Sequence, residues 1–251
     1  MAGHSHWAGI KYKKAAADAK RGKVFSKLSK ALSVAAREGG GNPDDNPKLR
    51  MVMEKCRQAN MPKDNVERAI KKGTGELAGE ELRRVVYEGY GSGGVALMVE
   101  CITDNANRTF PEVRRIFDSR GAKLGKSGSV AYMFRPKGLV SVKKEAADED
   151  ALLEIALEAG ADDLSDAGSV WEIICPPDEL QGLKAALAAA ELEPEIAEVT
   201  FIADAELEPG TEIQEKNLRL MAALEDHEDV ENVYANFTPS EEAVEHVAGE
   251  Q

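Results

Sequence analysis

The chain has 251 residues, a net charge of −13, and 31% charged, 43% hydrophobic and 5% aromatic residues. This length suffices for one large domain or for two to three small domains with their own apolar cores. The sequence has no run of about eighteen apolar residues, which excludes a membrane-spanning helix, and its start lacks the apolar segment of a secretory signal. We therefore expect a cytoplasmic protein that does not contact a membrane.

The three cysteines, Cys56, Cys101 and Cys175, lie far apart in the sequence. They form no C-x-x-C pair, so the pattern predicts neither a disulfide framework nor a cysteine-bound zinc ion.

The net charge hides a strong asymmetry between the two parts of the chain. Residues 1–75 contain 17 basic and 7 acidic residues, a net charge of +10, whereas residues 76–251 contain 15 basic and 38 acidic residues, a net charge of −23. A block of positive charge attracts polyphosphates, and a block of negative charge repels them. The asymmetry indicates nucleic-acid contact by the N-terminal part, carried on an acidic body.

Residues 1–22 are basic, rich in alanine and poor in large apolar side chains. We expect a flexible arm that passes into a helix. Trp7 on this arm could stack on a nucleic-acid base or pack on the helices that follow. The basic residues that we expect to neutralise phosphates here are Lys11, Lys13, Lys14, Lys20 and Arg21.

The stretch 23–38 has helical periodicity and ends at three glycines, 39–41. Apolar side chains gather on one side of this helix, and a stripe of bases gathers on the other. The stripe either solvates an exposed surface or binds phosphate, and its single sign favours phosphate binding. The lysines of the stripe that we assign to phosphate contact are Lys23, Lys27 and Lys30.

Two further short helices are predicted in the basic part. The first has Asn46 as its N-cap and Pro47 in its first position. The second starts near Pro62 and ends at Gly73. Three short amphipathic helices with tight turns predict a basic three-helix bundle over residues 1–78.

Beyond a linker at 74–80, the pattern changes to mixed strands and helices. Strands at 84–90 and 95–103 form a predicted hairpin, a helix covers 110–119, and a strand covers 129–134. A helix at about 212–226 and a strand at 230–237 come later. We expect residues 79–137 and 205–251 to form one α/β domain together.

Residues 138–204 contain a β-α-β-β-α-β order, which is typical of a ferredoxin-like domain. We therefore expect this domain to be inserted in the other α/β domain. The predicted fold class is α+β, with an N-terminal basic three-helix bundle followed by two ferredoxin-like α/β domains, the second inserted in the first.

No arrangement of catalytic residues is found. His4 and His6 lack nearby acidic or cysteine residues that could complete a metal shell, so phosphate contact or no role is favoured over metal. The glycine-rich strings 89–94 and 121–128 lack the spacing of phosphate-binding loops and are explained by hairpin and loop geometry. We predict a protein without enzymatic activity, metal or cofactor.

The sequence resembles the YebC/PmpR family over nearly its whole length. The residues that carry the resemblance are Met1-Ala2-Gly3-His4-Ser5, Trp7, Lys14-Ala15-Ala16, Asp18-Ala19-Lys20-Arg21-Gly22-Lys23, Gly39-Gly40-Gly41, Asn60-Met61-Pro62-Lys63-Asp64, Tyr87-Glu88-Gly89-Tyr90-Gly91, Thr103-Asp104-Asn105 and Asn107-Arg108-Thr109. The resemblance implies a basic helical domain with two α/β domains, the last nested in the second, and a cytoplasmic DNA-binding transcriptional regulator. Mitochondrial relatives are translational activators, and bacterial members are also connected with the ribosome.

The chain departs from the family pattern at two positions. His6 stands where the family usually has lysine, and Ala106 where it usually has arginine. Each change removes a permanent positive charge, so phosphate contact is less expected at His6 and Ala106.

Two readings of the function remain open from the sequence. The first is transcriptional regulation through DNA phosphates. The second is association with the ribosome or another RNA, because structured RNA presents the same phosphates. In both readings, the acidic domains offer a surface for a protein partner.

Overall fold

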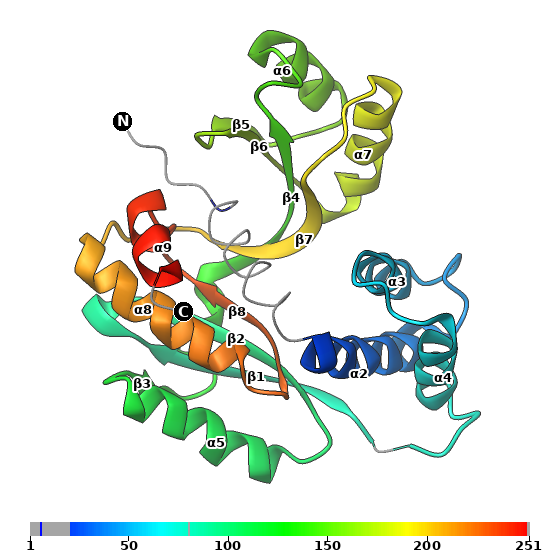
Figure 1. The fold of residues 1–251 in the computed structure, drawn as a ribbon, viewed down its shortest axis with the longest axis vertical. Helices are drawn as coiled ribbons and strands as arrows, with labels where there is room; N and C mark the ends of the chain where they lie inside the picture. Colours follow the sequence, from blue (N-terminus) through cyan, green and yellow to red (C-terminus); the bar gives the residue numbers. More distant parts are fainter. Residues whose placement is uncertain (1–5, 7–20, 80, 250–251) are drawn as a thin grey trace. The chain divides into compact units, whose positions relative to one another are not determined.

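The computed structural model describes residues 6, 21–79 and 81–249 (Figure 1). The chain divides into two compact units. One comprises the described part of Lys13–Val130 together with Arg219–Val233. The other comprises the described part of Met1–Tyr12 together with Ala131–Leu218 and the described part of Tyr234–Gln251.

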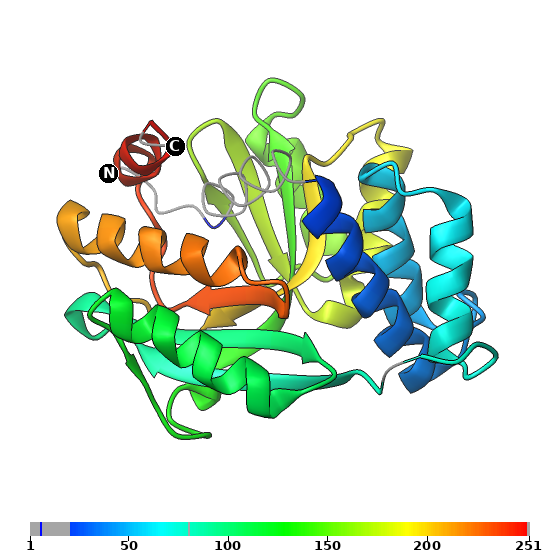
Figure 2. The ribbon, with the colours of Figure 1, turned by 60° about the horizontal axis from the view of Figure 1, so that its bottom comes forward.

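Among its described residues, the first unit begins with three helices: α2 (Arg21–Gly39), α3 (Pro47–Gln58) and α4 (Lys63–Gly73). Figure 2 shows them side by side, coloured blue to cyan. The Asn46 side chain caps α3 by accepting the N–H of Leu49, as the sequence predicted. The apolar faces of the three helices share a core that contains Leu32, Leu49, Cys56, Val66 and Ala69.

The first unit also carries a four-stranded sheet. Its strands are β1 (Arg83–Tyr90), β2 (Ala96–Thr103), β3 (Lys123–Leu124) and β8 (Val230–Ala235), in the order β3-β1-β2-β8. The predicted hairpin is confirmed, because β1 and β2 are antiparallel neighbours.

Helix α5 (Ala106–Ser119) follows β2 and packs beside β3. Asn105 caps it by accepting the N–H groups of Asn107 and Arg108. Phe117 of this helix is fully buried, and its ring lies against Gly89 of β1, where a Cβ atom would be 2.6 Å from Phe117 Cε1.

The second unit is built on another four-stranded sheet. Its strands are β4 (Phe134–Lys143), β5 (Asp163–Asp166), β6 (Val170–Cys175) and β7 (Ile196–Ala203), in the order β5-β6-β4-β7 with antiparallel neighbours. Helices α6 (Glu149–Glu158) and α7 (Leu180–Ala189) pack on one face, where they share an apolar core with β4 and β6. The fold is thus mixed α+β, with N-terminal helices and two antiparallel sheets.

Helix α8 (Thr211–Glu225) precedes β8, and α9 (Glu241–Ala248) follows it.

Several boundaries differ from the sequence predictions. The strand expected at 129–134 is wrong, because β4 begins only at Phe134 and a short 3-10 turn at Ala131–Met133 precedes it. The sequence predictions also omitted the two-residue strand β3 and the last helix.

Helices α2 and α4 approach each other closely at Gly73. A Cβ atom at Gly73 would be 2.2 Å from the carbonyl oxygen of Ser33 in α2. Because that oxygen belongs to the backbone, only a shift of a whole helix could relieve the clash. We expect Gly73→Ala to lower the free energy of unfolding by about 2 kcal/mol in urea denaturation.

Gly22→Ala is the matched control, since nothing lies within 4 Å of a Cβ atom at this position of α2. It should raise the free energy of unfolding by about 0.5 kcal/mol, because alanine favours the helix. Equal stabilities of Gly73→Ala and the wild type would contradict the close approach of the two helices.

Candidate nucleic-acid interface

The basic stripe of α2 lies against the acidic end of α8 in the first unit. Lys23 Nζ is 3.0 Å from Asp226 Oδ1 and 3.2 Å from the carbonyl oxygen of the same residue. Lys27 Nζ donates to the carbonyl oxygen of Glu225 at 2.5 Å. Two of the predicted phosphate contacts therefore meet acceptors of the protein itself.

The third lysine of the stripe reaches a buried carboxylate. Lys30 Nζ lies 2.6 Å from Asp229 Oδ1 and 3.2 Å from the carbonyl oxygen of Glu228. The other oxygen, Asp229 Oδ2, accepts Arg108 Nη2 and lies next to the hydroxyl of Thr109, each at 2.8 Å. The Asp229 side chain is fully buried, and it joins α2, α5 and the segment before β8.

The remaining predicted site residues are not placed in the same way. Trp7, Lys11, Lys13, Lys14 and Lys20 lie outside the described residues. Arg21 begins α2, but its side chain is not described. Among the predicted residues whose side chains the structure describes, Lys23, Lys27 and Lys30 lie together on α2.

Sequence reasoning missed the partners of this stripe. In the sequence, residues 225–229 form only an acidic run at the end of a predicted helix, and Arg108 lies in a polar segment after a predicted strand. A signal was present, because an acidic run at the C-terminal end of a helix adds to the negative end of the helix dipole and so attracts bases from elsewhere in the chain. Nothing in the sequence showed that α2 supplied those bases.

Burial and pairing set the protonation of these groups. Burial alone would raise the pKa of Asp229, but hydrogen bonds from Lys30, Arg108 and Thr109 outweigh burial and lower that pKa to about 2. Burial also lowers the pKa of Lys27, an effect that the neighbouring Glu225 and Asp226 oppose. These groups thus act as a charged network inside the protein.

His6 lies in the second unit near two carboxylates. Its Nδ1 is 3.7 Å from Glu172 Oε1 and 3.0 Å from Thr238 Oγ1, and its Nε2 is 3.5 Å from Glu206 Oε1. Glu172 is buried. An imidazole that faces carboxylates is poorly placed for an approaching phosphate, which agrees with the loss of the usual lysine at this position.

A second histidine, His227, belongs to a cluster with Glu112 and Asp229 whose ligand atoms could approach one metal ion. Its Nε2 is 3.0 Å from Glu112 Oε2, and its Nδ1 accepts the N–H of Asp229. Both oxygens of Asp229 already bind cationic side chains of the protein. Hydrogen bonding within the fold therefore explains this cluster without a metal ion.

The glycine-rich loop 121–128 closes around an internal anion. The carboxylate of the buried Glu88 accepts the N–H groups of Gly128 and Val130, each at 2.6 Å. The N–H of Gly125 donates to the Glu88 carbonyl at 2.7 Å. The loop thus holds a carboxylate of its own sheet.

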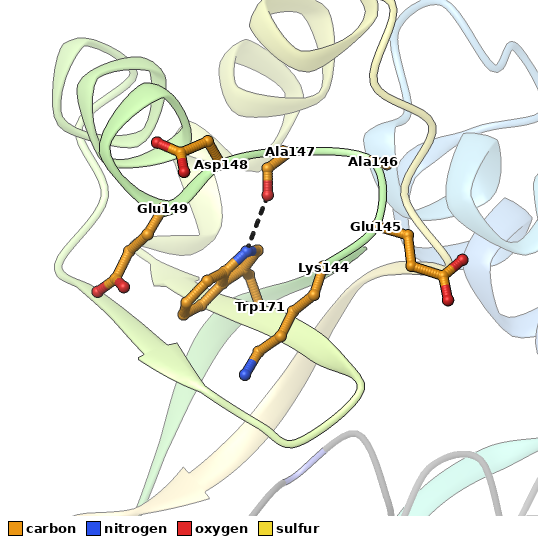
Figure 3. A pocket seen from close by; sticks show the side chains of 7 residues that line it. All are labelled: Lys144, Glu145, Ala146, Ala147, Asp148, Glu149 and Trp171. Atoms are coloured by element: carbon orange, nitrogen blue, oxygen red, sulfur yellow. Dashed lines mark hydrogen bonds between the residues drawn. The ribbon is translucent and has the colours of Figure 1, made fainter.

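An open hollow beside α6 is lined by residues 144–149 and Trp171 (Figure 3). The Trp171 indole N–H donates to the carbonyl of Ala147 at 3.1 Å, and Lys144 Nζ lies 4.5 Å from the centre of the ring. Lys144 also pairs with Asp166. These contacts hold the Trp171 indole and the Lys144 ammonium group in place beside the hollow.

The cysteines behave as core residues. Cys56, Cys101 and Cys175 are buried, and no disulfide joins them. Burial raises the pKa of their thiols to about 11, 12 and 11, respectively. At neutral pH they are therefore protonated and poor nucleophiles.

The fold and these contacts define an α+β protein in which a basic helical region meets an acidic segment of its own chain. Among the described helices, none combines the length and apolarity needed to cross a bilayer. The family model "TACO1/YebC protein N-terminal domain" matches residues 5–76, and the model "TACO1/YebC second and third domain" matches residues 82–237. The chain belongs to the TACO1/YebC family.

Individual relatives agree with this assignment. A probable transcriptional regulatory protein of Desulforapulum autotrophicum is 51% identical over 236 residues, which cover 94% of this chain and 96% of that protein. A protein of the same description from Acidobacterium capsulatum is 50% identical over 251 residues, covering 99% and 100%. These names support a regulatory role for this chain, and they do not name a class of enzyme.

A solved structure matches as well. The crystal structure of a conserved hypothetical protein from Aquifex aeolicus superposes with a TM-score of 0.80 at 47% sequence identity. The match covers 93% of this chain and 96% of that chain.

The charge network at Asp229 predicts a specific pH dependence of stability. Its folded-state pKa of about 2 lies below the ordinary value near 4, so the ionised carboxylate stabilises the fold above about pH 4. This contribution, about 2 kcal/mol, is lost as the pH falls from about 4 through 2. Asp229→Asn should lower the free energy of unfolding by about 3 kcal/mol at pH 7, because it leaves the side chains of Lys30 and Arg108 without their shared carboxylate.

The measurement is urea denaturation of both proteins between pH 7 and pH 3. The difference in the free energy of unfolding between the wild type and Asp229→Asn should become smaller as the pH approaches 3. Asp118→Asn is the control, since Asp118 pairs with Arg114 on the surface of α5 and should change stability by less than about 1 kcal/mol. A constant difference across the pH range would contradict the lowered pKa.

Proposed function

We propose that this protein is a non-enzymatic, cytoplasmic transcriptional regulator that binds DNA phosphates through its basic N-terminal domain, residues 1–78. The observation that carries the proposal is the net charge of +10 on residues 1–75 of a chain whose remainder is at −23. Relatives named as probable transcriptional regulatory proteins support the regulatory part. The proposed contacts are Lys11, Lys13, Lys14, Lys20, Arg21, Lys23, Lys27 and Lys30, with Trp7 stacking on a base.

Further bases of the helical region are exposed and could add phosphate contacts. Arg57 on α3 and Arg68, Lys71 and Lys72 on α4 all have exposed side chains. Cations of this kind provide affinity and salt dependence but no choice of sequence.

The rest of the chain has a different proposed role. Residues 138–204 contain 3 lysines and 17 acidic residues, which repel nucleic acid. We infer that they form the inserted ferredoxin-like domain, that residues 79–137 and 205–251 form the other α/β domain, and that the three N-terminal helices form a bundle. The acidic domains then limit indiscriminate binding and offer a surface to a protein partner.

A second candidate function is association with ribosomal or other structured RNA, as a translation factor or translational activator. The proposed contacts are mostly lysines, which recognise phosphate without reading base edges, and folded RNA satisfies such contacts equally well. Binding of the full chain to promoter DNA and to ribosomes at the same physiological salt concentration distinguishes the two candidates.

The direct test of the proposal is neutralisation of the arm. We expect the triple variant Lys11→Gln, Lys13→Gln, Lys14→Gln to bind a DNA duplex at least tenfold more weakly at 100 mM salt. The slope of log affinity against log salt should become shallower by up to about 3, because each lost phosphate contact removes roughly 0.9. Fluorescence anisotropy over a range of salt concentrations measures both quantities.

The matched control is Lys123→Gln, Lys126→Gln, Lys216→Gln. It changes the net charge equally at exposed lysines outside the basic domain. Its affinity and slope should stay near those of the wild type. Equal losses in both triple variants would mean that only the overall charge matters and would refute the proposed interface.

A further inference from the structure

The acidic end of α8 offers Lys23 and Lys27 the same kind of acceptor that a nucleic acid offers. A phosphate contacts an ammonium group through anionic oxygens. Here the oxygens come from the Asp226 carboxylate and from the carbonyls of Glu225 and Asp226. The last carbonyls of a helix carry the negative end of its dipole, which strengthens their attraction for cations.

The contacts along the stripe differ in how readily they can exchange. Lys23 and Asp226 form a surface pair, since their side chains are 48% and 44% exposed. Exposed pairs of this kind are weak and are screened by salt. A polyanion can therefore displace Asp226 without disturbing the fold.

The other end of the stripe is fixed. Lys30 is held by the fully buried carboxylate of Asp229. Next to Lys30 along α2, Ala31 and Val34 pack against Ile102 of β2 in an apolar cluster. These contacts keep α2 on its sheet, so an exchange of partners at Lys23 requires only side-chain movement.

From these contacts we propose that the end of α8 is an internal phosphate mimic that competes with nucleic acid for Lys23 and Lys27, whereas Asp229 holds Lys30 and makes it the least available of the proposed phosphate contacts on α2. This inference rests on the proposed function, because it concerns the regulation of the same basic surface. The mimic lowers the affinity for any polyanion. Ligands that make many contacts overcome this competition, and weak or short ligands do not.

The decisive variant is Asp226→Asn, which removes the competing charge without a change of size. We expect it to bind a 20-base-pair DNA duplex and a hairpin RNA about three- to tenfold more tightly than the wild type at 100 mM salt. The slope of log affinity against log salt should become steeper by about 1, because Lys23 then releases one more counterion from the nucleic acid.

Asp204→Asn is the matched control. Asp204 forms a surface pair with Arg135 in the other unit, with side-chain exposures of 50% and 56%, so the variant loses the same charge and a comparable ion pair. Its affinity and slope should stay at the wild-type values. Adding Lys23→Gln to Asp226→Asn should cancel the gain, whereas Lys23→Gln alone should weaken binding by a smaller factor than that gain.

The outcomes separate the two proposals. If the wild type binds nucleic acid but Asp226→Asn and Asp204→Asn bind equally well, the internal mimic is wrong and the proposed function stands. If no variant binds DNA or RNA at low salt, the proposed function fails and this inference fails with it. Thermal denaturation of each variant verifies that the fold is intact.

Discussion

A buried carboxylate, Asp229, holds three parts of the first unit together. It receives Lys30 from the N-terminal helix α2 and Arg108 and Thr109 from helix α5. A buried charge is strongly unfavourable unless cations and hydrogen-bond donors surround it, so these partners must stay in place while the unit is folded. The position of α2 on its sheet therefore depends on this one group as well as on the apolar contact of Ala31 and Val34 with Ile102.

This constraint changes the meaning of the charge asymmetry. The net charge of +10 on residues 1–75 and of −23 on residues 76–251 suggests two separate surfaces. One would attract polyanions, and the other would repel them. In the fold, part of the positive charge meets part of the negative charge, because Lys23, Lys27 and Lys30 contact residues 225–229. Cations that are already paired contribute less to ligand binding than their number implies. Under the proposed function, the acidic partners of these lysines therefore also affect the affinity for nucleic acid.

Internal anions recur elsewhere in the molecule. The Glu88 carboxylate accepts the N–H group of Gly128, at the end of the glycine-rich loop 121–128, and that of Val130 just after the loop. The carboxylates of Glu88 and Asp229 are bound for the same physical reason. Backbone N–H groups and lysine ammonium groups that are buried in a fold need anionic or carbonyl acceptors. Backbone N–H groups of a glycine-rich loop, and a stripe of lysines, can thus be bound by carboxylates of the same chain.

The sequence alone determined most of the local elements, because periodicity, Asn46 before Pro47 and the glycines that end α2 and α4 act within a few residues. It did not place the start of α5, which begins at Ala106 after the cap Asn105 and not at residue 110. It also determined the antiparallel hairpin and the family. It could not predict the short strand β3, whose two residues have no pattern of their own. Only the tertiary structure decided which acceptors meet the α2 lysines, because Lys30 and Asp229 are 199 residues apart and no local rule links them. Contacts at that separation depend on the packing of helices and sheets, which a charge pattern along the chain does not contain.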